Sequence, residues 1–181
     1  MKTKNEIISD YEALWQQVAS IVSPLSVEQF TTKPNAETWS IAQEFDHVIK
    51  VASAVSSALK ISPFILKWKF GKPNRSIRSY EQMHTKFTSA LASVGGKAKA
   101  PATFKSEEDK LFNKEEMLKH WSSTLAKFDQ RINKWSDKNL DKVLLPHPML
   151  GKMMVREMLY FTHIHTRHHL VSLKRKVAEI S

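Results

Sequence analysis

A histidine-rich stretch near the end of the chain decides how it folds: Phe161-Thr162-His163-Ile164-His165-Thr166-Arg167-His168-His169-Leu170. Within it, His165 and His169 are four residues apart, a spacing that puts both imidazoles on one face of a helix, one turn from each other. That face is the apolar side of the predicted helix, whereas His163 and His168 point elsewhere. A helix that offers two nitrogens to one metal ion uses this spacing, and such a site needs at least one further ligand from another element.

The same histidine pair also has a purely structural interpretation. Inward-facing histidines are often hydrogen-bonded core residues, and a histidine-rich helix end can be a solvated, weakly basic tail. The stretch contains no carboxylate and no cysteine beside the pair. From these residues alone, both interpretations stay open, and the metal site depends on finding a third ligand.

Length and composition favour one helical domain. The chain has 181 residues, of which 41% are hydrophobic, and it contains only four glycines and seven prolines. This predicts a single domain over residues 1–181 with a full core, rich in helix. The sequence has no cysteine, which excludes disulfides, thiolate zinc sites and a cysteine nucleophile. We find no signal-peptide pattern at Met1 and no apolar run of membrane-spanning length, so we expect a cytoplasmic protein.

The net charge of +10 is concentrated in one segment. Between His47 and Ser106, eleven lysines and arginines face a single acidic residue, Glu81, whereas the rest of the chain has 17 basic and 17 acidic residues. This distribution does not favour a nucleic-acid-binding protein. The segment could be a flap that holds an anionic ligand, a membrane surface or nucleic acid. We favour a connection whose apolar side chains pack on the helices while its lysines face water.

Hydrophobic periodicity predicts four amphipathic helices, at about residues 4–22, 40–61, 107–137 and 153–177, with a basic connector over 62–106. The first two begin with capping boxes, Thr3 with Glu6 and Ser40 with Gln43. The third helix begins either near Ser106 or at the capping residue Asn113. These elements predict an all-α fold, a four-helix bundle with long crossover connections.

Two residues at the start of the second predicted helix are candidates for the site. His47 lies at the border of the apolar stripe, where a histidine is usually a surface residue, but it would be well placed as the third ligand of the His165 and His169 pair. Glu44 lies one turn earlier. We expect it to be an exposed ion-pair partner, with orientation of a ligand or acceptance of a proton as the alternative. His147 and His168 are weaker candidates.

Several of these motifs also resemble one known family. The stretch 39–47, Trp-Ser-Ile-Ala-Gln-Glu-Phe-Asp-His, is similar to the start of the second helix in the DinB-like metal-binding four-helix bundles. The stretches 147–151 and 155–159, His-Pro-Met-Leu-Gly and Val-Arg-Glu-Met-Leu, resemble the entry to that family's last helix, and His165-x-x-x-His169 resembles its histidine pair. Each of these motifs is short, and it is their order and separation along the chain that make the resemblance to the family specific. The resemblance implies that His47, His165 and His169 bind one divalent metal ion and leave coordination positions open.

The resemblance also carries expectations about function. Members of the family include proteins regarded as metal-dependent hydrolases and thiol S-transferases that use bacillithiol or mycothiol, and dimers are common. We therefore expect a small-molecule substrate, a homodimer, and a zinc, nickel, iron or manganese ion that activates a water or a thiol. The family often has a glutamine shortly after the second histidine of the pair, whereas Leu170-Val171-Ser172-Leu173 follow here. The alternative is a non-catalytic bundle that binds an anionic partner through its basic central segment.

Overall fold

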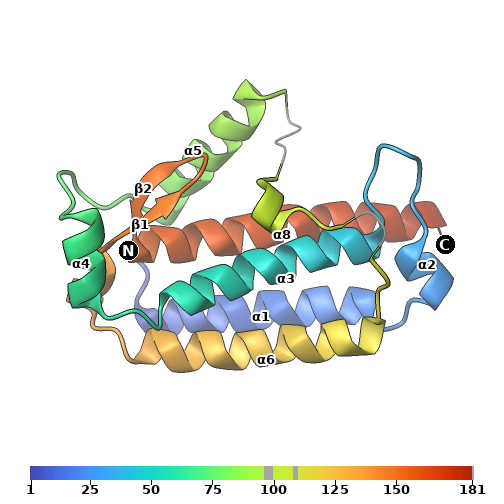
Figure 1. Ribbon diagram of the computed structural model, residues 1–181, viewed down its shortest axis with the longest axis horizontal. Coiled ribbons are helices and arrows are strands. Elements are labelled where there is room, and N and C mark those ends of the chain that lie inside the picture. Colours follow the sequence, from blue (N-terminus) through green and yellow to red (C-terminus); the bar gives the residue numbers. More distant parts are fainter. Residues whose placement is uncertain (96–99, 108–109, 181) are drawn as a thin grey trace.

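The computed structural model describes residues 1–95, 100–107 and 110–180, and the bundle in these residues is built from four long, roughly parallel or antiparallel helices (Figure 1). Helices α1 and α3 each pack against both α6 and α8, so α1 and α3 occupy opposite corners. The predicted all-α four-helix bundle is confirmed. The long helices are α1 (Lys4–Val22), α3 (Ile41–Ala58), α6 (Lys114–Asn133) and α8 (Val155–Ile180).

Short elements fill the connections between the long helices. Helix α2 lies at one end of the bundle, α4 lies at the other, and α5 leans against α8 (Figure 1). The predicted connector over 62–106 therefore contains helices, and its residues 96–99 lie outside the described part of the chain. The short elements are α2 (Val27–Thr31), α4 (Pro63–Phe70), α5 (Tyr80–Ser93), the 3-10 turn η1 (Ala102–Phe104), α7 (Asp137–Lys142), β1 (Leu144–His147) and β2 (Gly151–Met154).

Capping side chains fix where the helices begin. Thr3 and Ser40 form the two predicted capping boxes. In each, the hydroxyl accepts from the backbone N–H of the residue three positions later, and the side chain of that later residue accepts from the backbone N–H of the capping residue. The side chain of Asn113 accepts from the N–H of Glu116, so the third long helix begins at Lys114. It ends at Asn133, earlier than predicted, because Ser136 caps the separate helix α7.

A small antiparallel hairpin precedes α8, which the prediction of an all-α fold did not include. Strands β1 and β2 pair with Leu144 opposite Met154 and His147 opposite Gly151. Gly151 has a φ of +74°, a conformation that favours glycine, and it allows the chain to turn back. The hairpin leads directly into α8, so the turn that contains His147 is held close to the first turns of that helix.

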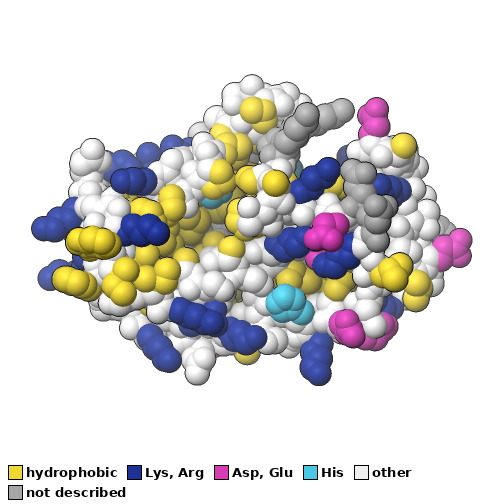
Figure 2. Space-filling model, in the orientation of Figure 1, with side chains coloured by type: hydrophobic (Ala, Val, Ile, Leu, Met, Phe, Trp, Pro, Cys, Tyr) yellow, Lys and Arg dark blue, Asp and Glu magenta, His cyan; other side chains and the backbone are white. Residues whose placement is uncertain are grey.

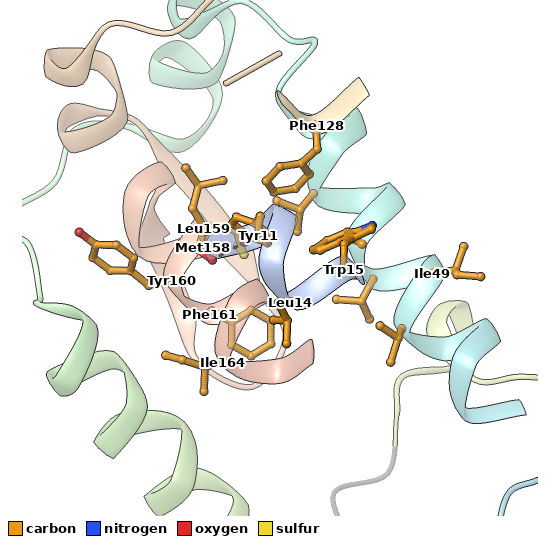
Figure 3. Packing of buried hydrophobic residues seen from close by; sticks show 14 of the residues in the cluster. Tyr11, Leu14, Trp15, Ile49, Phe128, Met158, Leu159, Tyr160, Phe161 and Ile164 are labelled. Atoms are coloured by element: carbon orange, nitrogen blue, oxygen red, sulfur yellow. Dashed lines mark hydrogen bonds between the residues drawn. The ribbon is translucent and has the colours of Figure 1, made fainter. Parts of the chain in front are cut away.

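Aromatic side chains join α1 to α6 in the core. The rings of Trp15 and Trp121 stack with centroids 4.1 Å apart, and each indole N–H donates to the backbone carbonyl of the other residue. Tyr11 and Phe128 extend this cluster, with centroids 4.7 Å apart (Figure 3). The hydroxyl of Tyr11 donates to the carbonyl of Leu159 on α8. Buried aromatic area and satisfied polar groups together fix the relative positions of three helices.

Buried ion pairs tie the start of α8 to the rest of the bundle. The carboxylate of Glu157 is fully buried and accepts from both terminal nitrogens of Arg75, each at 2.6 Å. Arg156, also buried, binds the carboxylates of Asp137 and Asp141 on α7. Arg75 belongs to the basic central segment, so part of the positive charge of that segment is neutralised by a buried carboxylate.

Helix α4 does not fully follow the favoured interpretation, in which the apolar side chains of the basic segment pack on the long helices. Its Leu66 is buried, but Phe64 and Trp68 are 78% and 81% exposed. Hydrophobic side chains gather over this end of the molecule among lysines and arginines (Figure 2). The expectation that the apolar residues of this segment pack on the bundle is therefore wrong for these two aromatics.

Among the described residues, no single helix is long and apolar enough to span a membrane; only α3 and α4 taken together would be, and they meet at an angle of 101°.

Candidate metal centre

Three imidazoles from two helices meet inside the bundle. His165 and His169 project from successive turns of α8, and His47 faces them from α3. The Nε2 atom of His165 lies 3.1 Å from Nε2 of His47 and 3.2 Å from Nε2 of His169. One ring nitrogen from each histidine lies within 4.8 Å of the other two. The structure thus brings together the three residues that the sequence analysis selected.

Hydrogen bonds to the opposite ring nitrogens fix the tautomers of two histidines. His47 Nδ1 lies 2.8 Å from the carbonyl oxygen of Phe104, and His169 Nδ1 lies 2.7 Å from Oε1 of Glu44. Both partners only accept, so each Nδ1 carries a hydrogen that it donates. In a neutral ring, Nε2 then presents a lone pair. The Nε2 atoms of His47 and His169 therefore each direct a lone pair toward a common position. Only Nε2 of His165 can carry a hydrogen there.

This arrangement fits a divalent cation. Ligand nitrogens at about 2.1 Å from a metal ion are separated by roughly 3.0 Å in octahedral and 3.4 Å in tetrahedral coordination. The two Nε2 separations at His165, 3.1 and 3.2 Å, fall in this range. His165 Nδ1 is buried and has no hydrogen-bond partner among the described residues, so no hydrogen bond at this nitrogen fixes the ring. A cation would satisfy all three facing nitrogens.

A buried carboxylate orients His169. Glu44, expected to be an exposed ion-pair partner, is instead buried, and this expectation is wrong. Its Oε1 accepts from His169, and its Oε2 accepts from Ser172 at 3.1 Å and from the ammonium of Lys176. Burial alone would raise the pKa of Glu44, but the hydrogen bonds from His169 and Lys176 and the charge of Lys176 outweigh it and lower the pKa to about 2. A carboxylate bonded to the far nitrogen of a ligand histidine is the usual partner in metal sites.

Burial keeps the other two imidazoles neutral. His47 is only 6% exposed, and burial lowers its pKa to about 4. Burial likewise lowers the pKa of His165 well below its usual value, and its histidine neighbours lower it further. Metal ligation requires the neutral imidazole, so the site favours the form that can bind.

The three histidines open onto a cavity of about 750 Å³ between α3, α4, α5 and the hairpin. His147 and His168 also line it. The Nδ1 of His147 accepts from the backbone N–H groups of Met149 and Leu150, at 3.2 and 3.0 Å, which leaves the hydrogen on Nε2. Burial lowers the pKa of His147 to about 4, so this side chain is a neutral hydrogen-bond donor in the cavity wall. Neither His147 nor His168 belongs to the group of three converging nitrogens.

Two partners of the site were not found from the sequence. Lys176 continues the helical stripe of His165, His169 and Ser172 by one more turn, so its position on the inner face was readable from the spacing. The role of the Phe104 carbonyl, by contrast, could not be predicted from the sequence, because every residue has a backbone carbonyl. The family often has a glutamine shortly after the second histidine. In this chain Ser172 lies in that stretch, and its hydroxyl donates to Glu44.

The fold and the site define a class of protein, the four-helix bundles that present three histidines from two helices at one end of an apolar cavity. The sequence profile of the DinB superfamily matches residues 10–172, and the chain belongs to this superfamily. It is similar to YuaE of Bacillus subtilis (strain 168), an uncharacterised protein, with 25% identity over 150 residues that cover 83% of this chain and 84% of YuaE.

The fold is also similar to a solved structure. YfiT from Bacillus subtilis, described as a probable metal-dependent hydrolase with an unusual four-helix bundle topology, superposes with a TM-score of 0.58 and 14% sequence identity. The match covers 98% of this chain and 87% of YfiT. At this identity, the likeness establishes the shared fold.

Proposed function

We propose that this protein is a metal-dependent enzyme in which His47, His165 and His169 hold one divalent ion. The observation that carries the proposal is the convergence of three Nε2 atoms, two of them fixed as acceptors by Phe104 and Glu44. Structural metal sites are normally closed by four protein ligands, whereas three ligands beside a cavity leave positions open for reactants. The donor set suits zinc, nickel, iron or manganese.

We infer that the reaction is a hydrolysis, with thiol transfer as the alternative. A bound divalent ion would lower the pKa of a coordinated water or thiol toward neutrality. Glu44 holds His169 in the tautomer that binds, and Lys176 holds Glu44 in place. His147 lines the cavity and carries its hydrogen on Nε2, so it is a candidate donor to an oxygen of a small-molecule substrate. The description of YfiT as a probable metal-dependent hydrolase favours hydrolysis.

The test is the metal content of untagged protein, measured by elemental mass spectrometry. We expect close to one equivalent of metal in the parent and loss of it in the His165→Ala, His169→Ala double variant and in His47→Ala. His168→Ala is the matched control, because it removes an imidazole from the same helix that is not among the converging nitrogens. A parent protein that takes up no divalent ion after reloading would overturn the proposal.

The exposed aromatics of α4 favour a second candidate function, a binding protein for an anionic partner. Phe64 and Trp68 are exposed beside Lys60, Lys69 and Lys72. Binding through several lysines should weaken steeply as the salt concentration rises. Co-sedimentation with anionic vesicles, or a shift assay with nucleic acid, at low and high salt tests this candidate. No binding at low salt would remove it.

A further inference from the structure

The shape of the cavity follows one face of α3. Five of its lining residues lie on this helix at positions 47, 51, 54, 55 and 58, which form one continuous stripe. At a rise of 1.5 Å per residue, the eleven steps along the helix from His47 to Ala58 span about 16 Å. The cavity therefore extends from the three histidines along α3 to α4, and we call this part of it the channel.

The chemistry of the wall changes along this channel. Around the histidine end, imidazoles line the wall, but further along it is formed by aliphatic side chains such as Val55 of α3 and Ile65 and Leu66 of α4. Among the described lining residues, no carboxylate is present, and the one ammonium, Lys69, lies on α4 at the far end. A cationic ligand would find no counter-charge there, and a sugar or nucleotide would leave most of its hydroxyl and phosphate groups unpaired.

Several of these apolar side chains are left open to solvent. Ile61 and Ile65 line the channel near α4, Val94 lines the cavity at the end of α5, and all three are exposed. Figure 2 shows a hollow lined with hydrophobic side chains beside α4 and beneath α5. An apolar group lying in the channel would cover them, and burial of each methylene contributes about 0.8 kcal/mol to binding.

We propose that the substrate is a linear aliphatic acyl compound, whose carbonyl group lies at His47, His165 and His169 and whose hydrocarbon chain extends along α3 toward α4. This inference rests on the proposed function for the position of the carbonyl group. The placement of the chain rests on the channel alone. His147 lines the cavity with its ring 4.3 Å from that of Phe161, and its Nε2 hydrogen is the candidate donor to the carbonyl oxygen.

The test uses straight-chain alkyl hydroxamic acids, from acetyl through butyryl and hexanoyl to octanoyl, titrated calorimetrically into metal-loaded protein. The head group binds the metal ion, and the chain samples the channel. We expect the dissociation constant to fall about four-fold per added methylene, which corresponds to about 0.8 kcal/mol. A dissociation constant that does not change with chain length would overturn the inference.

A variant that shortens the channel tests the direction of the chain. Ala54 lies midway along the stripe of α3, and Ala54→Phe should weaken octanoyl binding at least ten-fold while acetyl binding is unchanged. Ser57→Phe places the same ring on the exposed side of α3 and should change neither. Ala58→Leu is a milder block near the far end, used if the first variant does not fold. Equal loss for the acetyl and octanoyl compounds would contradict a chain lying along α3.

The same titrations separate this inference from the proposed function. In protein treated with a chelator, the head group loses its partner, so we expect all compounds to bind more weakly with the same dependence on chain length. If the protein binds no metal ion, the proposed function fails, and the chain-length dependence is then read with octanoyl, decanoyl and dodecanoyl compounds on the metal-free protein. A flat series there overturns the channel, and a steep one supports it.

Discussion

Glu157→Gln removes one buried negative charge while keeping the size and shape of the side chain. Four donors surround the native carboxylate: the two terminal nitrogens of Arg75 at 2.6 Å, and the backbone N–H groups of Arg78 and Met154 at 2.8 and 3.0 Å. A glutamine offers one accepting oxygen and one NH2 group. In either orientation of the amide, at least one N–H of the protein faces another N–H.

The size of the effect follows from these contacts. Breaking a buried ion pair by removing one partner costs about 3–5 kcal/mol. The side chain of Arg75 is 29% exposed and can turn toward water, so we expect the lower end, a loss of about 3 kcal/mol in the free energy of unfolding. For a chain of this length, each kcal/mol changes the melting temperature by about 2–4 °C, so the melting temperature should fall by roughly 6–12 °C.

The difference between parent and Glu157→Gln should also depend on pH. Burial alone would raise the pKa of Glu157, but the hydrogen bonds from Arg75 and from two backbone N–H groups outweigh it and lower the pKa in the folded state. The stabilisation is therefore fully present above the unfolded-state pKa of about 4.3 and is lost as the pH falls through the folded-state value. The gap between the two proteins should narrow below about pH 4.

Urea and thermal unfolding, followed by circular dichroism at neutral and acidic pH, measure these quantities. Glu179→Gln is the matched control, because Glu179 pairs with Arg175 on the exposed face of α8 at 3.8 Å. An exposed pair contributes about 0–1 kcal/mol, so this variant should unfold close to the parent. A Glu157→Gln protein within about 0.5 kcal/mol of the parent at neutral pH would refute the reasoning about the buried pair.

Three other substitutions have defined outcomes. Glu44→Gln should weaken metal binding about 10–100-fold, measured by competition with a chelating dye, because His169 loses its charged partner; unchanged affinity would contradict the role of this carboxylate. Trp121→Ala removes the ring stacked on Trp15 and should lower the free energy of unfolding by about 3–5 kcal/mol, measured in urea. Ser40→Ala removes a buried helix cap and should cost about 1–2 kcal/mol in the same assay.

Local signals in the sequence were sufficient for most of the helical architecture. The capping boxes at Thr3 and Ser40 depend on residues three apart, and each forms as the spacing predicts. The apolar stripes that define the long helices are likewise local. The hairpin before α8 was missed because its strands have four residues each, too few for an alternating pattern to stand out.

Burial of polar residues on α3 could not be read from the helix itself. Asp46 belongs to a polar stripe that would face solvent on an isolated helix, yet Ser106 and Lys110 from the distant connector reach over α3 and bind its carboxylate. Glu44 is covered by residues of α8, more than 120 positions later in the chain. These contacts depend on tertiary packing, so the helical wheel gave the correct face for His165 and His169 but the wrong environment for Glu44.

The hydrogen bond from His47 to the carbonyl oxygen of Phe104 has a consequence for how the site tolerates change. Any amino acid at position 104 supplies the same oxygen, so exchange of the side chain leaves this contact in place. What the contact requires is the path of the backbone between α5 and α6, which a single inserted or deleted residue would displace. The metal centre should therefore be more sensitive to the length of this connector than to its sequence, and a search for invariant side chains would overlook one of its supports.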